Sequence, residues 1–230
     1  MLISLHWIAF FYAIKISGIS LTLSIMASGA FITSLIEPIV FKRKLSLKEL
    51  TFGSITLIGL IIIFRSEFDQ YIGMLIAFLA TILSVIFTIL NSKLVEEKLS
   101  PVSITFYELF IGWFAISTYL LFDSDKMISL FKVDQNDIIL LLILGSICTA
   151  YAHLVSVKVM RNLSPFSFMI ILNLEPVYAI ILSLIIFGKN EIMSFDFYIG
   201  FTLILLAIFL DSLDKRKIRI KKLSQKKLPL

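Results

Sequence analysis

Residues 171–187 read ILNLEPVYAIILSLIIF, an almost continuous apolar run with an acidic residue and a proline near its start. A charge at the centre of a lipid bilayer costs roughly 2.5 to 3.5 kcal/mol on the lenient insertion scale. A proline in the interior of an ordinary helix costs about 3 kcal/mol. Because Glu175 and Pro176 combine both costs inside one apolar run, their position calls for a structural or functional reason.

The composition of the chain places that run in a membrane. The 230 residues are 59% hydrophobic and have a mean hydropathy of +0.99, beyond the range of soluble domains, so the sequence indicates an integral membrane protein. The net charge of +5 does not indicate nucleic-acid binding, because many of the basic residues crowd into the segment 215–227. The one cysteine, Cys148, excludes an intrachain disulfide.

Charged and turn residues divide the chain into eight apolar segments, most of them close to the roughly 20 residues that a helix needs to cross a bilayer. Strands of a membrane barrel would be shorter and would alternate in polarity. The sequence therefore predicts an all-α fold, a polytopic membrane helix bundle of about eight transmembrane helices. The predicted segments are 1–16, 18–41, 50–64, 70–92, 102–122, 137–160, 165–187 and 196–212.

The distribution of Lys and Arg predicts the orientation. The loops after 18–41, 70–92 and 137–160 and the basic tail at 213–230 hold most of the basic residues, and they all fall on the same side of an eight-helix topology. Since basic loops stay in the cytoplasm, both termini are predicted to be cytoplasmic. The tail is expected to lie on anionic lipid headgroups, each charge contributing about 1 kcal/mol near the surface.

An internal repeat relates the two halves of the chain. LHWIAFFYAIKISGIS, from Leu5, matches AHLVSVKVMRNLSP, from Ala152, and aligns His6 with His153, 147 residues later. The repeat predicts a first unit at 1–65 with three helices and a second at 70–212 with five. An odd number of helices per unit inverts alternate copies in the membrane. If the first unit is complete elsewhere, about two helices are missing ahead of Met1.

Four stretches in this order and spacing resemble the EamA branch of the drug/metabolite transporter superfamily: LHWIAFFYAIKIS, SGAFITSLIEPIVFKRKLS, LGSICTAYAHLVSVKVMRNLSP and LEPVYAIILSLIIFGKNE. The resemblance covers Leu5 to Leu210 and implies a ten-helix protein built from two inverted five-helix repeats, of which this chain lacks the first two helices. The first repeat of the family usually carries a proline near the position of Ala30, and this chain has none there. A break within 18–41 is therefore left without support from the sequence.

The resemblance implies a secondary transporter, commonly an exporter of amino acids, related metabolites or amphipathic drugs, working by alternating access. The alternative is a non-transporting protein, either truncated or a scaffold that needs the missing helices from elsewhere. An enzyme is not expected, because the sequence has no nucleophile with a base and no HExxH. No cofactor is expected, and the absence of a Gly-rich phosphate loop argues against ATP as the driving force. Abundant Ile, Phe and Lys favour a bacterial origin and hence the bacterial inner membrane.

Glu175 and Pro176 are the first site candidates. Proline removes the hydrogen-bond partner of the Leu172 carbonyl, which a water-lined cavity could satisfy. Glu175 would then bind a cationic group or a proton, and Asn173 and Tyr178 on the same segment are further candidates. The competing interpretation is a neutral Glu175 inside a purely structural kink.

Three more candidates come from the repeat and one from a polar stripe. His153 and His6, with its neighbour Trp7, could face one cavity from equivalent positions and bind substrate or relay protons, or they could be packing residues. Two histidines without a carboxylate triad do not complete a zinc site, so no metal is expected. Glu108, on a stripe of small and polar residues two turns into 102–122, is a candidate substrate or proton contact. Glu37, followed by Pro38, is interpreted as a helix-interface residue.

Overall fold

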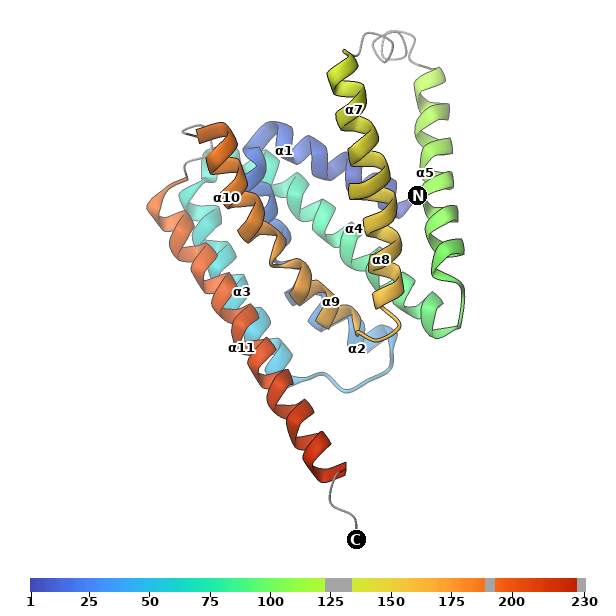
Figure 1. Cartoon of the computed structure of the whole chain (residues 1–230). Coiled ribbons are helices and arrows are strands. Elements are labelled where there is room, and N and C mark those ends of the chain that lie inside the picture. Colours follow the sequence, from blue (N-terminus) through green and yellow to red (C-terminus); the bar gives the residue numbers. More distant parts are fainter. Residues whose placement is uncertain (123–133, 189–192, 227–230) are drawn as a thin grey trace.

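The structure is a computed structural model that describes residues 1–122, 134–188 and 193–226, and within these ranges the chain forms helices and loops without a strand. Six helical rods are long and apolar enough to cross a membrane, and two shorter apolar helices accompany them. The protein is therefore an integral, multi-pass membrane protein with the all-α architecture that the hydropathy pattern predicts. Figure 1 shows the helices side by side, with the C-terminal end of α11 extending beyond the bundle.

The first half of the chain forms three helices, α1 (Leu2–Met26), α2 (Gly29–Val40) and α3 (Leu47–Ser66), followed by the short turn η1 (Phe68–Gln70). Helix α1 bends at Gly18, whose φ of 78° and ψ of 170° are accessible to glycine and strained for other residues. A second interruption, at Ala27 and Ser28, separates α1 from α2. The structure thus differs from the expectation of one unbroken helix over 18–41.

The second half begins with two long helices and continues with a rod in three parts. Helices α4 (Tyr71–Glu96) and α5 (Pro101–Leu121) are regular, and α5 starts with Pro101 at a position where no N–H is needed. The rod consists of α7 (Gln135–Ile143), the π-helical η2 (Leu144–Tyr151) and α8 (Ala152–Val159). Hydropathy predicted the helix at 137–160. It could not predict the π-helical part, since hydropathy indicates burial and not the type of helix.

The last part of the chain contains the broken helix that the opening sequence suggested. Helix α9 (Pro165–Leu172) ends before a turn at Asn173 and Leu174, and α10 (Glu175–Phe187) continues after it. Helix α11 (Phe195–Lys226) runs on past the predicted end of the last apolar segment at 212. Ser164 caps α9 by accepting a hydrogen bond from the Ser167 N–H at 3.2 Å.

Two antiparallel helix pairs organise the bundle. Helix α1 packs along α4, and α3 packs along α11 (Figure 1). At the closest approach of the second pair, a Cβ on Gly59 would lie 2.5 Å from the Gly200 carbonyl oxygen, and the reverse distance is the same. Only glycine at both positions permits this backbone contact. Helices α2, α9 and α10 lie between the two pairs, where α2 contacts α9 and α1 contacts α10.

Candidate functional site

The two interrupted helices meet at their interruptions. The Asn173 side-chain amide, in the α9–α10 turn, donates a hydrogen bond to the carbonyl oxygen of Ala27, in the α1–α2 turn, at 3.1 Å. Asn173 is buried, and it satisfies a carbonyl that a helix end would otherwise leave without a partner. Ala27 and Leu174 are 147 residues apart, the spacing that also relates His6 to His153. The two turns thus lie at matching positions of the sequence repeat, and one hydrogen bond joins them.

Glu175 is the first residue of α10 and follows this junction directly. It lines a cavity of about 30 Å³ together with residues of α1, α4 and α9, namely Leu23, Met26, Ala27, Thr81, Ser84, Met169, Leu172 and Asn173. Among the described residues Glu175 has neither a hydrogen-bond partner nor an ion-pair partner, and its side chain is exposed. The N-terminus of α10 favours a negative charge at this position. The carboxylate is therefore available to a cationic ligand or a proton.

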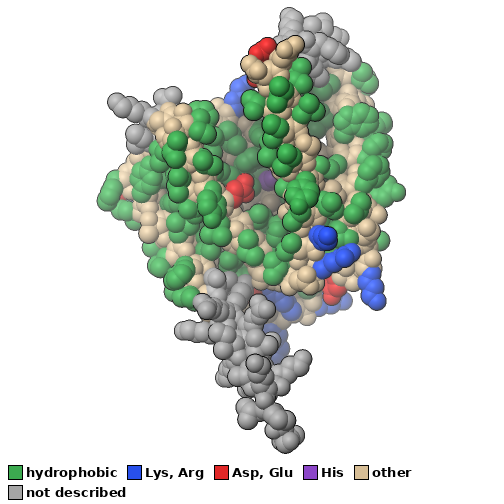
Figure 2. Space-filling model, in the orientation of Figure 1, with side chains coloured by type: hydrophobic (Ala, Val, Ile, Leu, Met, Phe, Trp, Pro, Cys, Tyr) green, Lys and Arg blue, Asp and Glu red, His purple; other side chains and the backbone are tan. Residues whose placement is uncertain are grey.

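A hollow leads to this part of the molecule. Figure 2 shows acidic and histidine side chains at the bottom of a depression between α10 and the α7–η2–α8 rod. Tyr178, one helical turn after Glu175, is also exposed on α10. The surface beside the depression is apolar, because every residue of α7 and most of η2 expose their side chains. Polar groups inside an apolar opening are typical of sites that bind small organic molecules.

A second polar group lies between α4, α5 and α8. The Glu108 carboxylate, through Oε2, contacts His153 Nε2 at 2.8 Å and accepts a hydrogen bond from Asn91 Nδ2 at 3.0 Å. His153 and Asn91 are buried. The indole ring of Trp7 meets the His153 ring edge-on, with centroids 6.5 Å apart. Three of the residues predicted from the sequence, from three different segments, are therefore in one cluster.

His6, which the sequence match aligns with His153, has different partners. Its Nδ1 lies 2.8 Å from the Ala80 carbonyl oxygen, so Nδ1 must carry the proton that is donated. Both histidines contact the ring of Phe87, with centroids 5.4 Å away for His6 and 6.0 Å away for His153. The two histidines thus share one aromatic neighbour, but only His153 has a carboxylate partner among the described residues.

A third polar cluster lies at the end of the bundle that carries most of the basic residues. Glu37 Oε2 accepts the backbone N–H of Phe166 at 2.7 Å, and Glu37 Oε1 accepts from Arg43 Nε at 3.2 Å. Arg43 also binds Glu49 at 2.8 Å. Partial burial alone would lower the pKa of the Arg43 guanidinium, but its bonds to Glu49 and Glu37 outweigh that effect and raise the pKa. The Glu37 carboxylate thereby caps α9 of the second repeat from α2 of the first.

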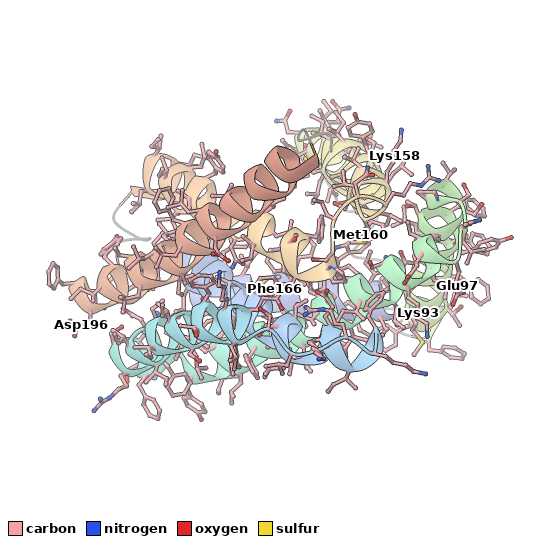
Figure 3. All side chains as sticks on the ribbon, turned by 90° about the horizontal axis from the view of Figure 1, so that it is seen from below. Lys93, Glu97, Lys158, Met160, Phe166 and Asp196 are labelled. Carbon is pink, nitrogen blue, oxygen red and sulfur yellow. The ribbon has the colours of Figure 1, made fainter. Side chains whose placement is uncertain are left out.

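This cluster borders a crevice of about 570 Å³. Figure 3, seen from below, places Lys158 in the last turn of α8, Met160 directly after α8, Phe166 at the start of α9 and Lys93 near the end of α4 on this side of the bundle. Glu37 had been interpreted from the sequence as an interface residue, and its contacts are those of an interface residue. Asn91 lies on a stripe of small and polar residues of α4, with Ala77, Ser84 and Thr88, for which the sequence predicts helix packing, and its amide donates a hydrogen bond across to Glu108 on α5.

Comparison with known proteins identifies the family to which the chain belongs. The EamA-like transporter family matches residues 71–213, which include α4 to α10 and the membrane part of α11. The chain belongs to the EamA-like transporter family. This EamA-like chain is therefore of the drug/metabolite transporter type, a class of membrane transporters rather than enzymes. No curated protein and no solved structure matches it.

The described part of this EamA-like protein contains no group of three His, Cys, Asp or Glu side chains close enough to hold a metal ion. The polar groups that it does contain can bind cations, protons and hydrogen-bonding solutes. The expected site residues form two groups, Glu175 with Asn173 and Tyr178 on the broken helix, and Glu108 with His153, Trp7 and His6 beside α4.

Proposed function

We propose that this EamA-like chain is a secondary transporter that exports small organic solutes, such as amino acids, related metabolites or amphipathic drugs, by alternating access. The observation that carries the proposal is the junction of the two interrupted helices, with the unpaired Glu175 carboxylate next to it. Interrupted helices supply free backbone groups and helix ends at the middle of a membrane, which is where transporters bind their substrates. Glu175 adds a negative charge that selects a cationic group.

Alternating access is supported by the two places, one on either side of the junction, where helices cross each other. On one side α1 meets α10, where the hydroxyl groups of Ser20 and Ser183 are 3.2 Å apart. On the other side α2 meets α9, where Glu37 caps Phe166. Opening one crossing while the other stays closed would expose the central junction to one side of the membrane at a time.

The experiment is transport into proteoliposomes made with the purified chain, using radiolabelled lysine and tetraphenylphosphonium as cationic probes and leucine as a zwitterionic one. We expect E175Q to reduce uptake of the cationic probes by roughly 10- to 100-fold, since a charge-assisted contact contributes about 1.5 to 3 kcal/mol. E96Q, at an exposed residue near the end of α4, is the matched control and should transport normally. Wild-type rates for E175Q with every probe would refute a role for the carboxylate.

A second candidate function is a non-transporting scaffold that needs helices from another polypeptide. It is favoured by the α7–η2 segment, in which none of the described side chains is buried. Chemical cross-linking from the exposed Cys148 in native membranes distinguishes the candidates. A cross-linked partner, together with absence of transport by the purified chain alone, would support the scaffold. Transport by the purified chain would exclude it.

The proposed location is the bacterial inner membrane, with the C-terminus in the cytoplasm. The support is the gathering of basic residues at one end of the bundle, because basic loops are retained in the cytoplasm. These residues are Lys42, Arg43, Lys44, Lys48, Lys93, Lys98, Lys158 and Arg161. The basic tail at 213–230, most of which belongs to α11, would bind anionic lipid on the same side.

A further inference from the structure

We infer that Glu108, His153 and Asn91 form a proton-binding site that couples proton movement to transport. The coupling rests on the proposed transport function, whereas proton binding itself does not. The site joins three helices, since Asn91 lies on α4, Glu108 on α5 and His153 on α8. It is separate from the Glu175 cavity, whose lining includes none of these three residues.

An ionised Glu108 assigns the hydrogens of the cluster. A carboxylate oxygen only accepts, so Oε2 accepts from Asn91 Nδ2, and in its contact with His153 at 2.8 Å the hydrogen lies on Nε2. His153 is therefore either the neutral tautomer with its hydrogen on Nε2 or the imidazolium. A proton taken from water binds His153 Nδ1 and converts the pair of carboxylate and neutral imidazole into an ion pair of carboxylate and imidazolium, and its release restores the neutral imidazole.

Few other titratable groups face this pair. His6 from α1 lies close enough for its charge to act on His153. Helix α4 contributes the amide of Asn91, which does not titrate, while Lys93 of α4 and Lys158 of α8 are exposed at the end of the bundle. Histidine is the side chain that changes charge near neutral pH without strong perturbation. The pair can therefore respond to the proton gradients that membranes maintain.

Three buried hydroxyl groups give the site a polar approach. Ser4 Oγ, Thr88 Oγ1 and Thr105 Oγ1 are buried and have no hydrogen-bond partner in the described part of the chain. Thr88 precedes Asn91 by nearly one turn of α4, and Thr105 precedes Glu108 in the same way on α5. Ser4 occupies the space beside Gly112, one turn after Glu108. Buried hydroxyls of this kind are normally satisfied by water, which can carry a proton to the carboxylate.

Protonation changes the attachment of α8 to α5. A charged imidazolium binds the carboxylate more strongly than a neutral imidazole does. Proton binding therefore favours the arrangement in which α8 is held against α5, and proton release favours its separation. Helix α8 leads directly into the loop before α9, the first half of the broken helix that bears the Glu37 contact. The proton thus acts on the same element that the proposed transport cycle moves.

Trp7 offers a direct test, because protonated imidazole quenches indole fluorescence and the Trp7 ring contacts His153. The chain has two tryptophans, so W113F leaves Trp7 as the single reporter. In this background we expect fluorescence to fall as the pH is lowered, and the change to be lost in H153Q. E108Q should move the midpoint to lower pH, because the negative charge that stabilises the imidazolium is gone. E97Q, at an exposed residue after α4, is the matched control for E108Q and should retain the titration.

If E108Q does not fold, N91A provides the measurement. Without the hydrogen bond from Asn91, the Glu108 carboxylate interacts more strongly with the His153 imidazolium. The midpoint of the fluorescence titration should therefore move to higher pH, opposite to E108Q. A titration that persists in H153Q, or midpoints that stay unchanged in both E108Q and N91A, would overturn the site. Folded E108Q should also transport the cationic probes with the pH dependence lost. Failure of E175Q to affect transport would leave this titration intact, so the two proposals fail separately.

Discussion

Glu37 shows how a carboxylate can be stable inside an apolar helix. Its side chain is 4% exposed, yet both oxygens have donors, one from the Phe166 N–H and one from Arg43. A buried charge is tolerated when it is paired and hydrogen-bonded. Glu175 has no such partners among the described residues. Glu37 and Glu175, each followed by a proline in the sequence, therefore differ in their surroundings.

At the residue scale, the first prediction concerns this cap. E37A should lower the free energy of unfolding by roughly 2 to 3 kcal/mol, because it removes the carboxylate that accepts the Phe166 N–H and one of the two carboxylates that bind Arg43. E37Q should cost less, since its amide oxygen can still accept the Phe166 N–H. Thermal or SDS unfolding in detergent measures both. E97A, at an exposed residue, is the control, and equal stabilities of E37A and E97A would contradict the role of Glu37.

Residue contacts between distant segments were beyond prediction from the sequence. Glu37 and Phe166 are 129 residues apart, and no local pattern announces their contact. His153, Glu108 and His6 could be nominated because polar residues in apolar segments need partners. Their partners could not be assigned, because the repeat suggested symmetric roles for the two histidines, whereas only one of them binds a carboxylate in the described structure.

At the scale of elements, the apolar segments predicted the helices well, and the failures have local causes. Pro176 predicts the break at Asn173 and Leu174, because its backbone nitrogen cannot donate a hydrogen bond. The corresponding break at Ala27 and Ser28 has no proline, so it could not be predicted in the same way. Tertiary contacts hold this second break, among them the bond from Asn173. The helix is thus interrupted at both matching positions, although a proline follows only one of them.

The second prediction tests the contact between α3 and α11. G59A should destabilise the protein by about 1 to 3 kcal/mol, because the new methyl group would press on the Gly200 carbonyl oxygen and the backbone would have to move. G145A is the matched control, since nothing lies within 4 Å of a Cβ at Gly145. Unfolding in detergent compares the two variants. Similar stabilities would mean that the helices are not packed closely at Gly59.

At the scale of the whole molecule, the proposed topology can be checked directly. Fusion of green fluorescent protein after Leu230 should give fluorescent cells, whereas fusion of alkaline phosphatase at the same place should give an inactive enzyme. The reason is that basic residues gather at the end of the bundle where α11 leaves it (Figure 1). Fusion within residues 123–133, between the predicted helices 102–122 and 137–160, serves as the opposite control. Active phosphatase at Leu230 would reverse the orientation.

The Glu37 cap also makes the two repeats unequal. The equivalent position in the second repeat, 147 residues later, is Leu184, which has no charge to offer. One crossing therefore includes a charge-assisted contact, while the other includes a contact between two hydroxyl groups. A difference of about 1.4 kcal/mol between the free energies of opening the two crossings changes the ratio of the two open conformations tenfold. Under the proposed cycle, the transporter without substrate would therefore favour the conformation that is closed on the cytoplasmic side. The cell would then lose little of its contents between transport cycles.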